Sequence, residues 1–194
     1  MATKKAEKIL NTTIKLFLHK DIRKITMDEI AAFCNVSKVT LYKYFTDKDT
    51  LLFNIGRVIF SDYQKQLEVV TGSDEPLKKK LYDFLAVITE FKDCGKLDLC
   101  RELAKCNIDV TDEYKRYLET YKQSMMVLID SGIEEGMIKK ELNREHVFHY
   151  IDMGVIYYQK DSIYRNRMLN DHQFQLEFLT FFINNIFADE SHIL

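Results

Sequence analysis

Residues 34–45 read CNVSKVTLYKYF, and the interpretation of the whole chain depends on this stretch. Its Val, Thr, Tyr and Phe residues suit a β-strand, because β-branched and aromatic side chains favour a pleated surface. Its first residues favour a different structure. Asn35 tolerates the left-handed backbone of a sharp turn, and Ser37 is a strong N-cap for a following helix. The stretch therefore predicts a turn and then a short helix that begins at Lys38.

Helix signals lie on both sides of this turn. Thr26 and Glu29 have the spacing of a capping box, in which each side chain binds the backbone N–H of the other residue. Thr46 and Asp49 repeat that spacing and predict the start of a further helix. An earlier helix is expected from its apolar spacing at Ile9, Leu10, Ile14 and Phe17. Two short helices joined by a tight turn, over about residues 26–45, predict a helix-turn-helix.

The whole chain predicts an all-α protein. Its 194 residues contain one proline and six glycines, too few breakers for a many-turned β protein. A long fourth helix is expected at about 47–70, after which the chain predicts five more helices at about 76–94, 97–107, 112–132, 144–165 and 171–188. We expect a DNA-binding domain at 1–50 and a helical regulatory and dimerisation domain at 51–194.

Charge is distributed unevenly along the chain. Residues 1–50 contain ten Lys and Arg residues and six Asp and Glu residues, a balance of +4. The net charge of the whole chain is −2, so the remaining residues carry −6. A basic segment suits a polyanion, although a solvated basic end has the same composition. Charge by itself therefore does not distinguish the two.

The spacing of residues 38–45 predicts the roles of the short helix's two faces. At 100° per residue, Leu41 and Phe45 lie together, while Val39 and Lys43 point the opposite way. Lys43 is suited to guanine acceptors, and Val39 to a thymine methyl group. Thr40, Tyr42 and Tyr44 offer hydroxyl groups to phosphates at the flanks, and Lys48 adds a charge nearby. Each of these residues taken singly is also compatible with an ordinary surface or packing role.

The last two expected helices are more apolar than one buried face requires. In 144–165 the apolar residues are Val147, Phe148, Tyr150, Ile151, Met153, Val155, Ile156, Tyr157 and Tyr158. In 171–188 they are Phe174, Leu176, Phe178, Leu179, Phe181, Phe182, Ile183, Ile186 and Phe187. A homodimer through both helices would cover this surplus, because a two-fold interface lets one patch cover its own copy. A central helix in a monomeric core is the alternative.

A ligand pocket is expected among the helices of the C-terminal part. Aromatic and Met side chains on those helices suit an apolar ligand with a few hydroxyl contacts, although such residues are more often plain core. The candidates are Tyr82, Phe91, Tyr117, Tyr121, Met125, Met153 and Tyr157. Cofactor and metal sites are not expected, because His146 and His149 have no third ligand in view and the four cysteines form no CxxC pair.

Two longer segments carry a resemblance to a known family. ILNTTIKLF followed by ITMDEIAAFCNVSKVTLYKYFTDKDTLL resembles the DNA-binding module of the TetR/AcrR family over about residues 5–52. SGIEEGMIKKELNREHVFHYI is similar to the family's connection into its last two helices. The chain departs from the family pattern at Asn35 and Val39, where Gly, and Gly or Ala, are usual. HKDIRK also lacks the Gly that is common after the first helix.

The resemblance implies nine helices, a homodimer built on the last two, and a ligand-responsive transcription factor that is usually a repressor. Carried over by motif position, the DNA-facing set is Lys38, Val39, Thr40, Tyr42, Lys43 and Tyr44, with Thr26 and Lys48 on phosphates. The expected partners are a pseudo-palindromic double-stranded DNA operator and a small-molecule effector.

Other classes of function are left with less support. An enzyme needs a nucleophile, a base and an orienting group together, and the sequence shows no two of these at a convincing spacing. A helical interaction protein would use the same module against a partner protein, and an activator would share the fold. The sequence start lacks a hydrophobic signal core, and no apolar run approaches the ~18 residues that span a bilayer. We therefore expect a cytoplasmic protein.

Overall fold

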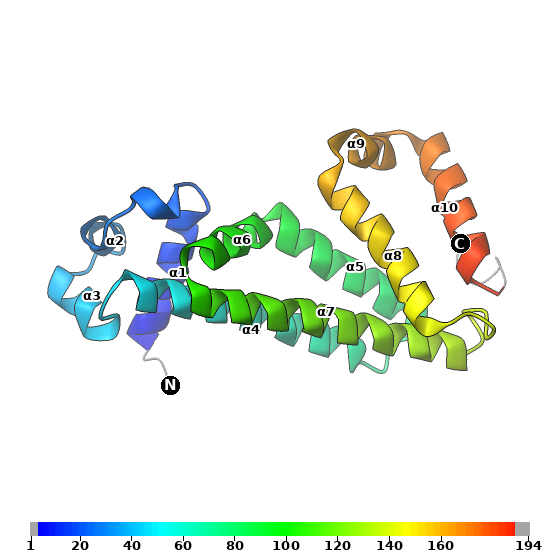
Figure 1. Cartoon of the computed structure of the whole chain (residues 1–194), viewed down its shortest axis with the longest axis horizontal. Helices are drawn as coiled ribbons and strands as arrows, with labels where there is room; N and C mark the ends of the chain where they lie inside the picture. Colours follow the sequence, from blue (N-terminus) through cyan, green and yellow to red (C-terminus); the bar gives the residue numbers. More distant parts are fainter. Residues whose placement is uncertain (1–3, 189–194) are drawn as a thin grey trace. The chain divides into compact units, whose positions relative to one another are not determined.

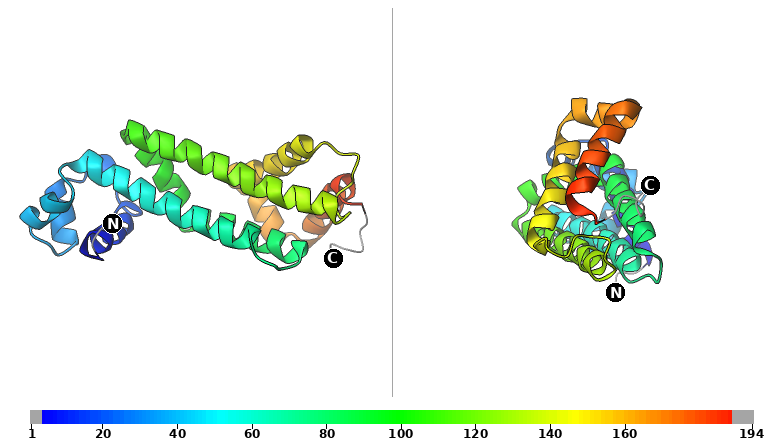
Figure 2. Two further views of the ribbon diagram at one scale, coloured as in Figure 1. Left: turned by 90° about the horizontal axis from the view of Figure 1, so that it is seen from below. Right: turned by 90° about the vertical axis from the view of Figure 1, so that its right-hand side faces the viewer.

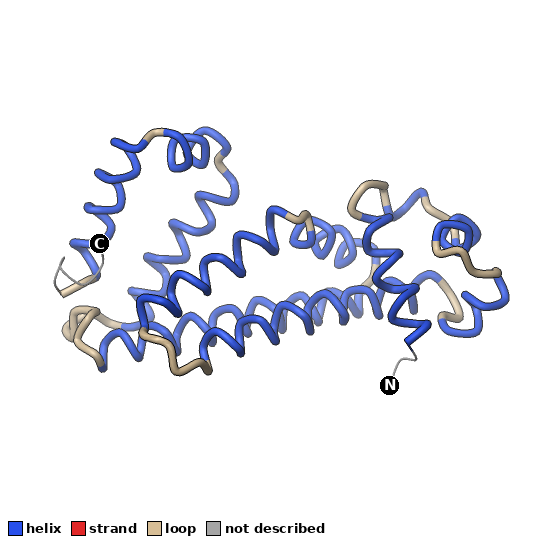
Figure 3. Tube along the Cα trace, turned by 180° about the vertical axis from the view of Figure 1, so that it is seen from behind, coloured by secondary structure: helices blue, strands red, loops and turns tan. Residues whose placement is uncertain are grey.

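The computed structural model describes residues 4–188, apart from the side chains of seven helical residues in that range. Among the apolar residues named above, Leu179, Phe182 and Ile183 are three of those seven and lie outside the described side chains. The described part folds into ten α-helices and one 3-10 turn (Figure 1). It contains no strand, only an isolated bridge between Ile138 and Phe187 (Figure 3). The all-α prediction is confirmed.

The chain divides into two compact units, formed by residues 1–72 with 83–121 and by residues 73–82 with 122–194. The first unit holds α1 (Lys4–Phe17), the 3-10 turn η1 (Ile22–Lys24), α2 (Met27–Phe33), α3 (Lys38–Tyr44), α4 (Lys48–Thr71) and α6 (Lys96–Cys106). The second unit holds α8 (Arg144–Lys160), α9 (Ser162–Asn170) and α10 (His172–Ile186). Two helices contribute to both units, α5 (Leu77–Asp93) and α7 (Ile108–Glu134).

In the first unit, helix α4 joins the N-terminal module to the helices that follow. It packs against α1 and α6, and the N-terminal part of α7 runs beside it (Figure 2). Gly56 makes this approach close, because a Cβ there would stand 3.0 Å from a methyl group of Val110. The buried face of α4 consists of Leu51, Leu52, Ile55, Gly56, Ile59, Phe60, Tyr63 and Leu67. The packing therefore does not separate residues 1–50 from α4, and a domain boundary at residue 50 stays a prediction.

The helix expected at 144–165 is wrong, because Asp161 interrupts it. This residue ends α8 with an extended backbone, and its carboxylate Oδ1 accepts a hydrogen bond from the N–H of Tyr164 at 2.7 Å. The same carboxylate thereby begins α9, which includes most of the segment expected to be a loop. Asp171 repeats the arrangement before α10 and accepts from the N–H of Phe174 at 3.0 Å. The described chain accordingly has one α-helix more than the nine expected.

The start of α4 also differs from the expected capping box. Asp47, not Thr46, is the N-cap, and its Oδ1 accepts a hydrogen bond from the N–H of Thr50 at 2.7 Å. This bond lowers the pKa of Asp47, because it stabilises the charged form. The sequence TDKD offers two capping residues in a row, and the second one satisfies the helix terminus.

In the second unit, the end of α10 is hydrogen-bonded to the loop between α7 and α8. The N–H of Lys139 donates to the carbonyl oxygen of Ile186 at 3.0 Å, and the N–H of Ala188 donates to that of Met137 at 2.9 Å. Gly132 permits the loop to fold back, since a Cβ there would stand 2.7 Å from Ile138. Within residues 4–188, no helix combines the length and the apolarity that crossing a membrane requires.

Candidate nucleic-acid interface

The first helix of the predicted helix-turn-helix begins with the capping box read from the sequence. The Thr26 N–H donates to the Glu29 carboxylate at 2.8 Å, and the Glu29 N–H donates to the Thr26 hydroxyl at 3.3 Å. The hydrogen bonds that this carboxylate accepts from the Thr26 N–H and hydroxyl group lower the pKa of Glu29, because they favour its ionised form. The Thr26 hydroxyl group also donates to that carboxylate at 2.8 Å. Thr26 thus starts α2, and a phosphate contact by its side chain stays a prediction.

The turn between α2 and α3 has the geometry that its residues indicate. Asn35 adopts a left-handed backbone with φ of 53° and is the one non-glycine residue with positive φ in the described chain. The N–H of Val36 then donates back to the carbonyl oxygen of Ala31 at 3.0 Å. Ser37 is the N-cap of α3 and accepts from the N–H of Thr40 at 3.1 Å. Asn35 can replace the usual glycine because its short polar side chain tolerates this conformation.

Helix α3 has one buried face and one face left to solvent. Leu41 is fully buried at 0% exposure and Phe45 is buried at 3%. On the opposite side Val39 is 80% exposed, and Tyr42 and Lys43 are exposed as well. The predicted division of the helix into an inward and an outward face is therefore confirmed. Its outward face combines an apolar group, a phenol and an ammonium group.

Two other residues of the expected DNA-facing set have partners inside the module. The Lys38 ammonium group lies 2.9 Å from the Asp28 carboxylate, which raises the pKa of Lys38, and 6.0 Å from the centre of the Tyr42 ring. The Thr40 hydroxyl lies 2.8 Å from that of Ser37. Lys38 and Asp28 are both exposed, and exposed ion pairs contribute little free energy, so this ammonium group can exchange partners. The sequence analysis did not identify Asp28 as the ion-pair partner of Lys38.

Lys48 lies at the first position of α4, but its side chain turns toward protein backbone. Its Nζ donates to the carbonyl oxygens of Ile22 and Ile25, each at 2.6 Å, and reaches that of Arg23 at 3.5 Å. Three carbonyl groups around the η1 turn are thereby held by one ammonium group. Hydrogen bonds from a charged donor are among the stronger ones in proteins. The structure gives Lys48 a positioning role, and its contact with phosphate stays a prediction.

The residues expected to line a ligand pocket are only partly brought together. Phe91 and Tyr117 lie in one aromatic cluster of the first unit, with ring centres 5.6 Å apart. Tyr121 stacks on Phe84, and Met125 is buried in the second unit. By contrast, the side chains of three others are more than half exposed: Tyr82, Met153 and Tyr157. Side chains as exposed as these do not support a place in an enclosed pocket of the chain.

The aromatic cluster includes a residue that sequence reasoning did not single out. Tyr63 on α4 is 1% exposed, and its ring lies 4.5 Å from Phe91 and 4.8 Å from Tyr117 between centres. Phe60 and Tyr114 complete the cluster through their contacts with Tyr117. The Tyr63 hydroxyl makes no well-aligned hydrogen bond among the described residues, although the Tyr117 hydroxyl lies close enough to interact with it. Burial raises the pKa of both phenols, so both remain protonated at neutral pH.

Known proteins are similar in sequence to the N-terminal module of this chain. Residues 9–55 match the family model described as bacterial regulatory proteins, tetR family. The uncharacterized HTH-type transcriptional regulator YerO of Bacillus subtilis is 26% identical over 155 residues, which cover 75% of this chain and 54% of YerO. The chain thus spans about half the length of that relative.

Solved structures share the fold over nearly the whole chain. A transcriptional regulator of the TetR/AcrR family superposes with a TM-score of 0.71 and 22% identity, covering 92% of this chain and 98% of that one. The structure of SmeT in complex with triclosan superposes with a TM-score of 0.66 and 14% identity, covering 97% and 94%. At these identities the likeness is one of fold.

The N-terminal module is thus similar to that of tetR-family regulatory proteins, and the chain shares its fold with a solved structure of a TetR/AcrR family member. The family match covers the N-terminal quarter of the chain, residues 9–55.

Substitution of the two lysines is expected to affect stability to different extents. Lys48→Met removes the donor to two carbonyl oxygens, which is expected to lower the free energy of unfolding by about 1 to 2 kcal/mol. Lys43→Met changes an exposed side chain and is expected to change it by less than about 0.5 kcal/mol. Urea unfolding followed by circular dichroism measures both. Equal midpoints for the two variants would contradict the positioning role of Lys48.

Proposed function

We propose that the protein is a transcriptional repressor that binds a pseudo-palindromic operator as a dimer and releases it when a small molecule binds the C-terminal part. The observation that carries the DNA-binding part is the outward face of α3, where Val39, Tyr42 and Lys43 are exposed on a helix whose other side is buried. A helix-turn-helix presents this face of its second helix to the major groove. A protein with this function would act in the cytoplasm, at the nucleoid.

Within this proposal the residues of α3 divide into two kinds of contact. Lys43 donates to guanine acceptors and Val39 contacts a thymine methyl group, so these two specify sequence. Thr40, Tyr42 and Tyr44 bind phosphates at the flanks and position the helix without specifying sequence. Lys38, Thr26 and Lys48 belong to the same phosphate-binding set. Val39 is 80% exposed, and its bulk favours a base step with a methyl group.

Binding of the protein to the DNA upstream of its own gene tests this part. Lys43→Ala is expected to weaken specific binding by a factor of about 5 to 100, the range of a lost base contact. Lys65→Ala, an exposed lysine on α4, serves as the matched control and is expected to leave binding unchanged. Fluorescence anisotropy with labelled duplex measures both.

The salt dependence of the same measurement provides a second criterion. Affinity is expected to fall steeply as salt rises, because neutralised phosphates release counterions. A flat dependence, or equal affinities for Lys43→Ala and the unchanged protein, would remove the DNA-binding part of the proposal.

The effector site is proposed at the aromatic cluster around Tyr63, Phe91 and Tyr117. The Tyr63 hydroxyl is buried and poorly hydrogen-bonded beside Tyr117, and a ligand with a hydrogen-bond acceptor would give it a well-aligned partner. The rings lie 4.5 to 5.6 Å apart between centres and pack on one another, so an aromatic ligand that enters would exchange these ring contacts for its own. SmeT, which shares the fold, binds triclosan in its solved structure, and this supports a small aromatic effector here.

Removal of the Tyr63 hydroxyl tests the effector site. Tyr63→Phe keeps the ring and is expected to reduce about fivefold the potency of an aromatic compound that releases the operator, which corresponds to one neutral hydrogen bond. Tyr82→Phe removes an exposed hydroxyl and is the matched control. A panel of phenols and aromatic ketones is screened for operator release by anisotropy. If Tyr63→Phe and Tyr82→Phe respond alike to every active compound, the effector lies elsewhere.

The dimer is proposed through α8 and α10 of the second unit. Both helices expose large apolar side chains, which monomeric proteins rarely leave in groups. On α8 they are Met153, Ile156 and Tyr157, and on α10 they are Leu176 and Phe181. A two-fold interface would cover them with their own copies and would present two α3 helices to one operator.

A charge placed on the proposed interface is expected to separate the subunits. Phe181→Glu buries a carboxylate if the dimer forms as proposed, so the variant is expected to be monomeric at micromolar concentration. Leu118→Glu, at an exposed leucine of α7 in the first unit, is the control and should leave the dimer intact. Light scattering gives the mass of each. A monomeric unchanged protein, or a dimeric Phe181→Glu variant, would refute this interface.

A further inference from the structure

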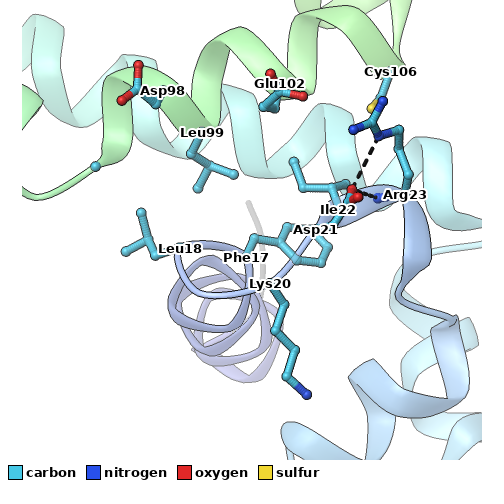
Figure 4. A pocket seen from close by; sticks show the side chains of 11 residues that line it. Phe17, Leu18, Lys20, Asp21, Ile22, Arg23, Asp98, Leu99, Glu102 and Cys106 are labelled. Carbon is cyan, nitrogen blue, oxygen red and sulfur yellow. Dashed lines mark hydrogen bonds and ion pairs between the residues drawn. The ribbon is translucent and has the colours of Figure 1, made fainter.

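A groove lies in the first unit between the end of α1, the η1 turn and α6 (Figure 4). Its volume is about 410 Å³, which falls within the range of small-molecule sites. It is separate from the aromatic cluster around Tyr63, because none of that cluster's residues lines it. Neither the DNA-facing helix nor the proposed dimer helices contribute to it, so the functions proposed above do not use this groove.

The inner surface of the groove is apolar. Phe17 from α1, Ile22 from η1 and Leu99 from α6 are buried, and Leu18 beside them is partly exposed. Figure 4 shows the Leu99 side chain pointing from α6 toward Phe17. Gly95 at the start of α6 has φ of 77°, and a Cβ there would stand 3.3 Å from Leu18. A ligand with an apolar body would replace water against this surface.

The rim of the groove carries more negative than positive charge. Three carboxylates line it, those of Asp21, Asp98 and Glu102. Two cations line it as well, Lys20 and Arg23. The Arg23 guanidinium already binds Asp21 at 3.2 Å, and Figure 4 shows the Lys20 ammonium group directed away from the groove. Asp98 and Glu102 on α6 thus stand beside an apolar surface, with the Arg23 guanidinium also attracting Glu102.

These two carboxylates have partners on their own helix that a ligand can replace. Asp98 binds Arg101 at 3.0 Å and Glu102 binds Lys105 at 2.7 Å, and neither cation lines the groove. Exposed pairs of this kind contribute little free energy, so exchange for a ligand cation costs little. Asp98 and Glu102 are four residues apart, so both lie on one face of α6. The rim is thus complementary in charge to a cation.

The groove is also linked to the DNA-binding module through η1. Asp21, Ile22 and Arg23 form one wall of the groove, and the carbonyl oxygens of Ile22 and Arg23 face the ammonium group of Lys48 on the other side. Lys48 begins α4, four residues after the end of α3. A ligand that contacts η1 therefore contacts the turn whose carbonyl oxygens accept hydrogen bonds from Lys48. These bonds connect η1 to the start of α4.

We propose that this groove binds an organic cation with an apolar aromatic body, and that occupancy changes the affinity for the operator. The apolar body packs on Phe17, Ile22 and Leu99, and the cationic group binds Asp98 and Glu102. Coupling to the operator rests on the proposed DNA-binding function, whereas binding in the groove does not. By linkage, the operator changes the affinity for the cation by the same factor.

The test uses 2-naphthamidinium as the probe and neutral 2-naphthamide as its isosteric control, with the full chain free of DNA. Calorimetric titration is expected to detect the amidinium and not the amide. Asp98→Asn and Glu102→Gln should each weaken binding about threefold, the size of one exposed ion pair. Asp112→Asn, an exposed carboxylate with an i,i+3 lysine partner outside the groove, is the matched control and should change nothing.

Four results would overturn the proposal. They are no binding of the amidinium at millimolar concentration, equal binding of the amide, equal effects of Asp98→Asn and Asp112→Asn, and loss of binding in Tyr63→Phe, which would place the probe in the aromatic cluster. For the coupling, saturating probe is expected to change the operator dissociation constant at least threefold. An unchanged constant would refute the regulatory part. Probe binding without any operator binding would instead reject the proposed function and leave the groove site standing.

Discussion

The burial of Leu41 and Phe45 is the interaction on which the candidate interface depends. Helix α3 has seven residues, and isolated helices shorter than about 12 residues are marginal in water. Its β-branched and aromatic residues also favour a strand. Tertiary packing overrides both tendencies, because Leu41 at 0% exposure and Phe45 at 3% fix the helix on the module. Once those two side chains hold it, the residues on the outward face are not needed for packing.

The attachment of the module to α4 depends on two adjacent residues with different partners. Asp47 accepts from the backbone of its own helix, at Thr50, while Lys48 donates to backbone carbonyls at Ile22 and Ile25. The first contact begins α4 and the second holds the connection between α1 and α2 against it. A short recognition helix can be oriented by a longer one only if such contacts span the turn between them. Lys48 is therefore as much a part of the module as the residues of α3.

Local signals in the sequence predicted the module well. The capping box at Thr26 and Glu29, the left-handed Asn35 and the cap at Ser37 each involve residues within three positions of one another, and all three are present. Their partners are neighbours in sequence, so spacing alone identifies them. The error at the start of α4 has the same origin, because Thr46 and Asp47 are both capping residues and spacing does not rank them.

The contacts that sequence did not predict are those between residues far apart in the chain. Lys48 lies 26 residues from Ile22, and its charge and motif position in the sequence indicate a phosphate contact without showing that its side chain donates to these backbone carbonyls. The side chains of Tyr82, Met153 and Tyr157 were expected in a pocket because helical spacing shows which residues share a face but not which face meets a neighbour.

Asp161 shows the limit of apolar periodicity in the same way. The hydrophobic pattern continues across it, yet one carboxylate oxygen at 2.7 Å from the N–H of Tyr164 is enough to end α8 and begin α9. The break turns Tyr164 back onto the rings of Tyr157 and Phe178, with centre distances of 4.9 and 5.4 Å. The local cap and the distant ring contacts support each other, and only the first of these is visible in the sequence. A capping residue inside an apolar run is therefore a possible helix boundary, and packing decides whether it is used.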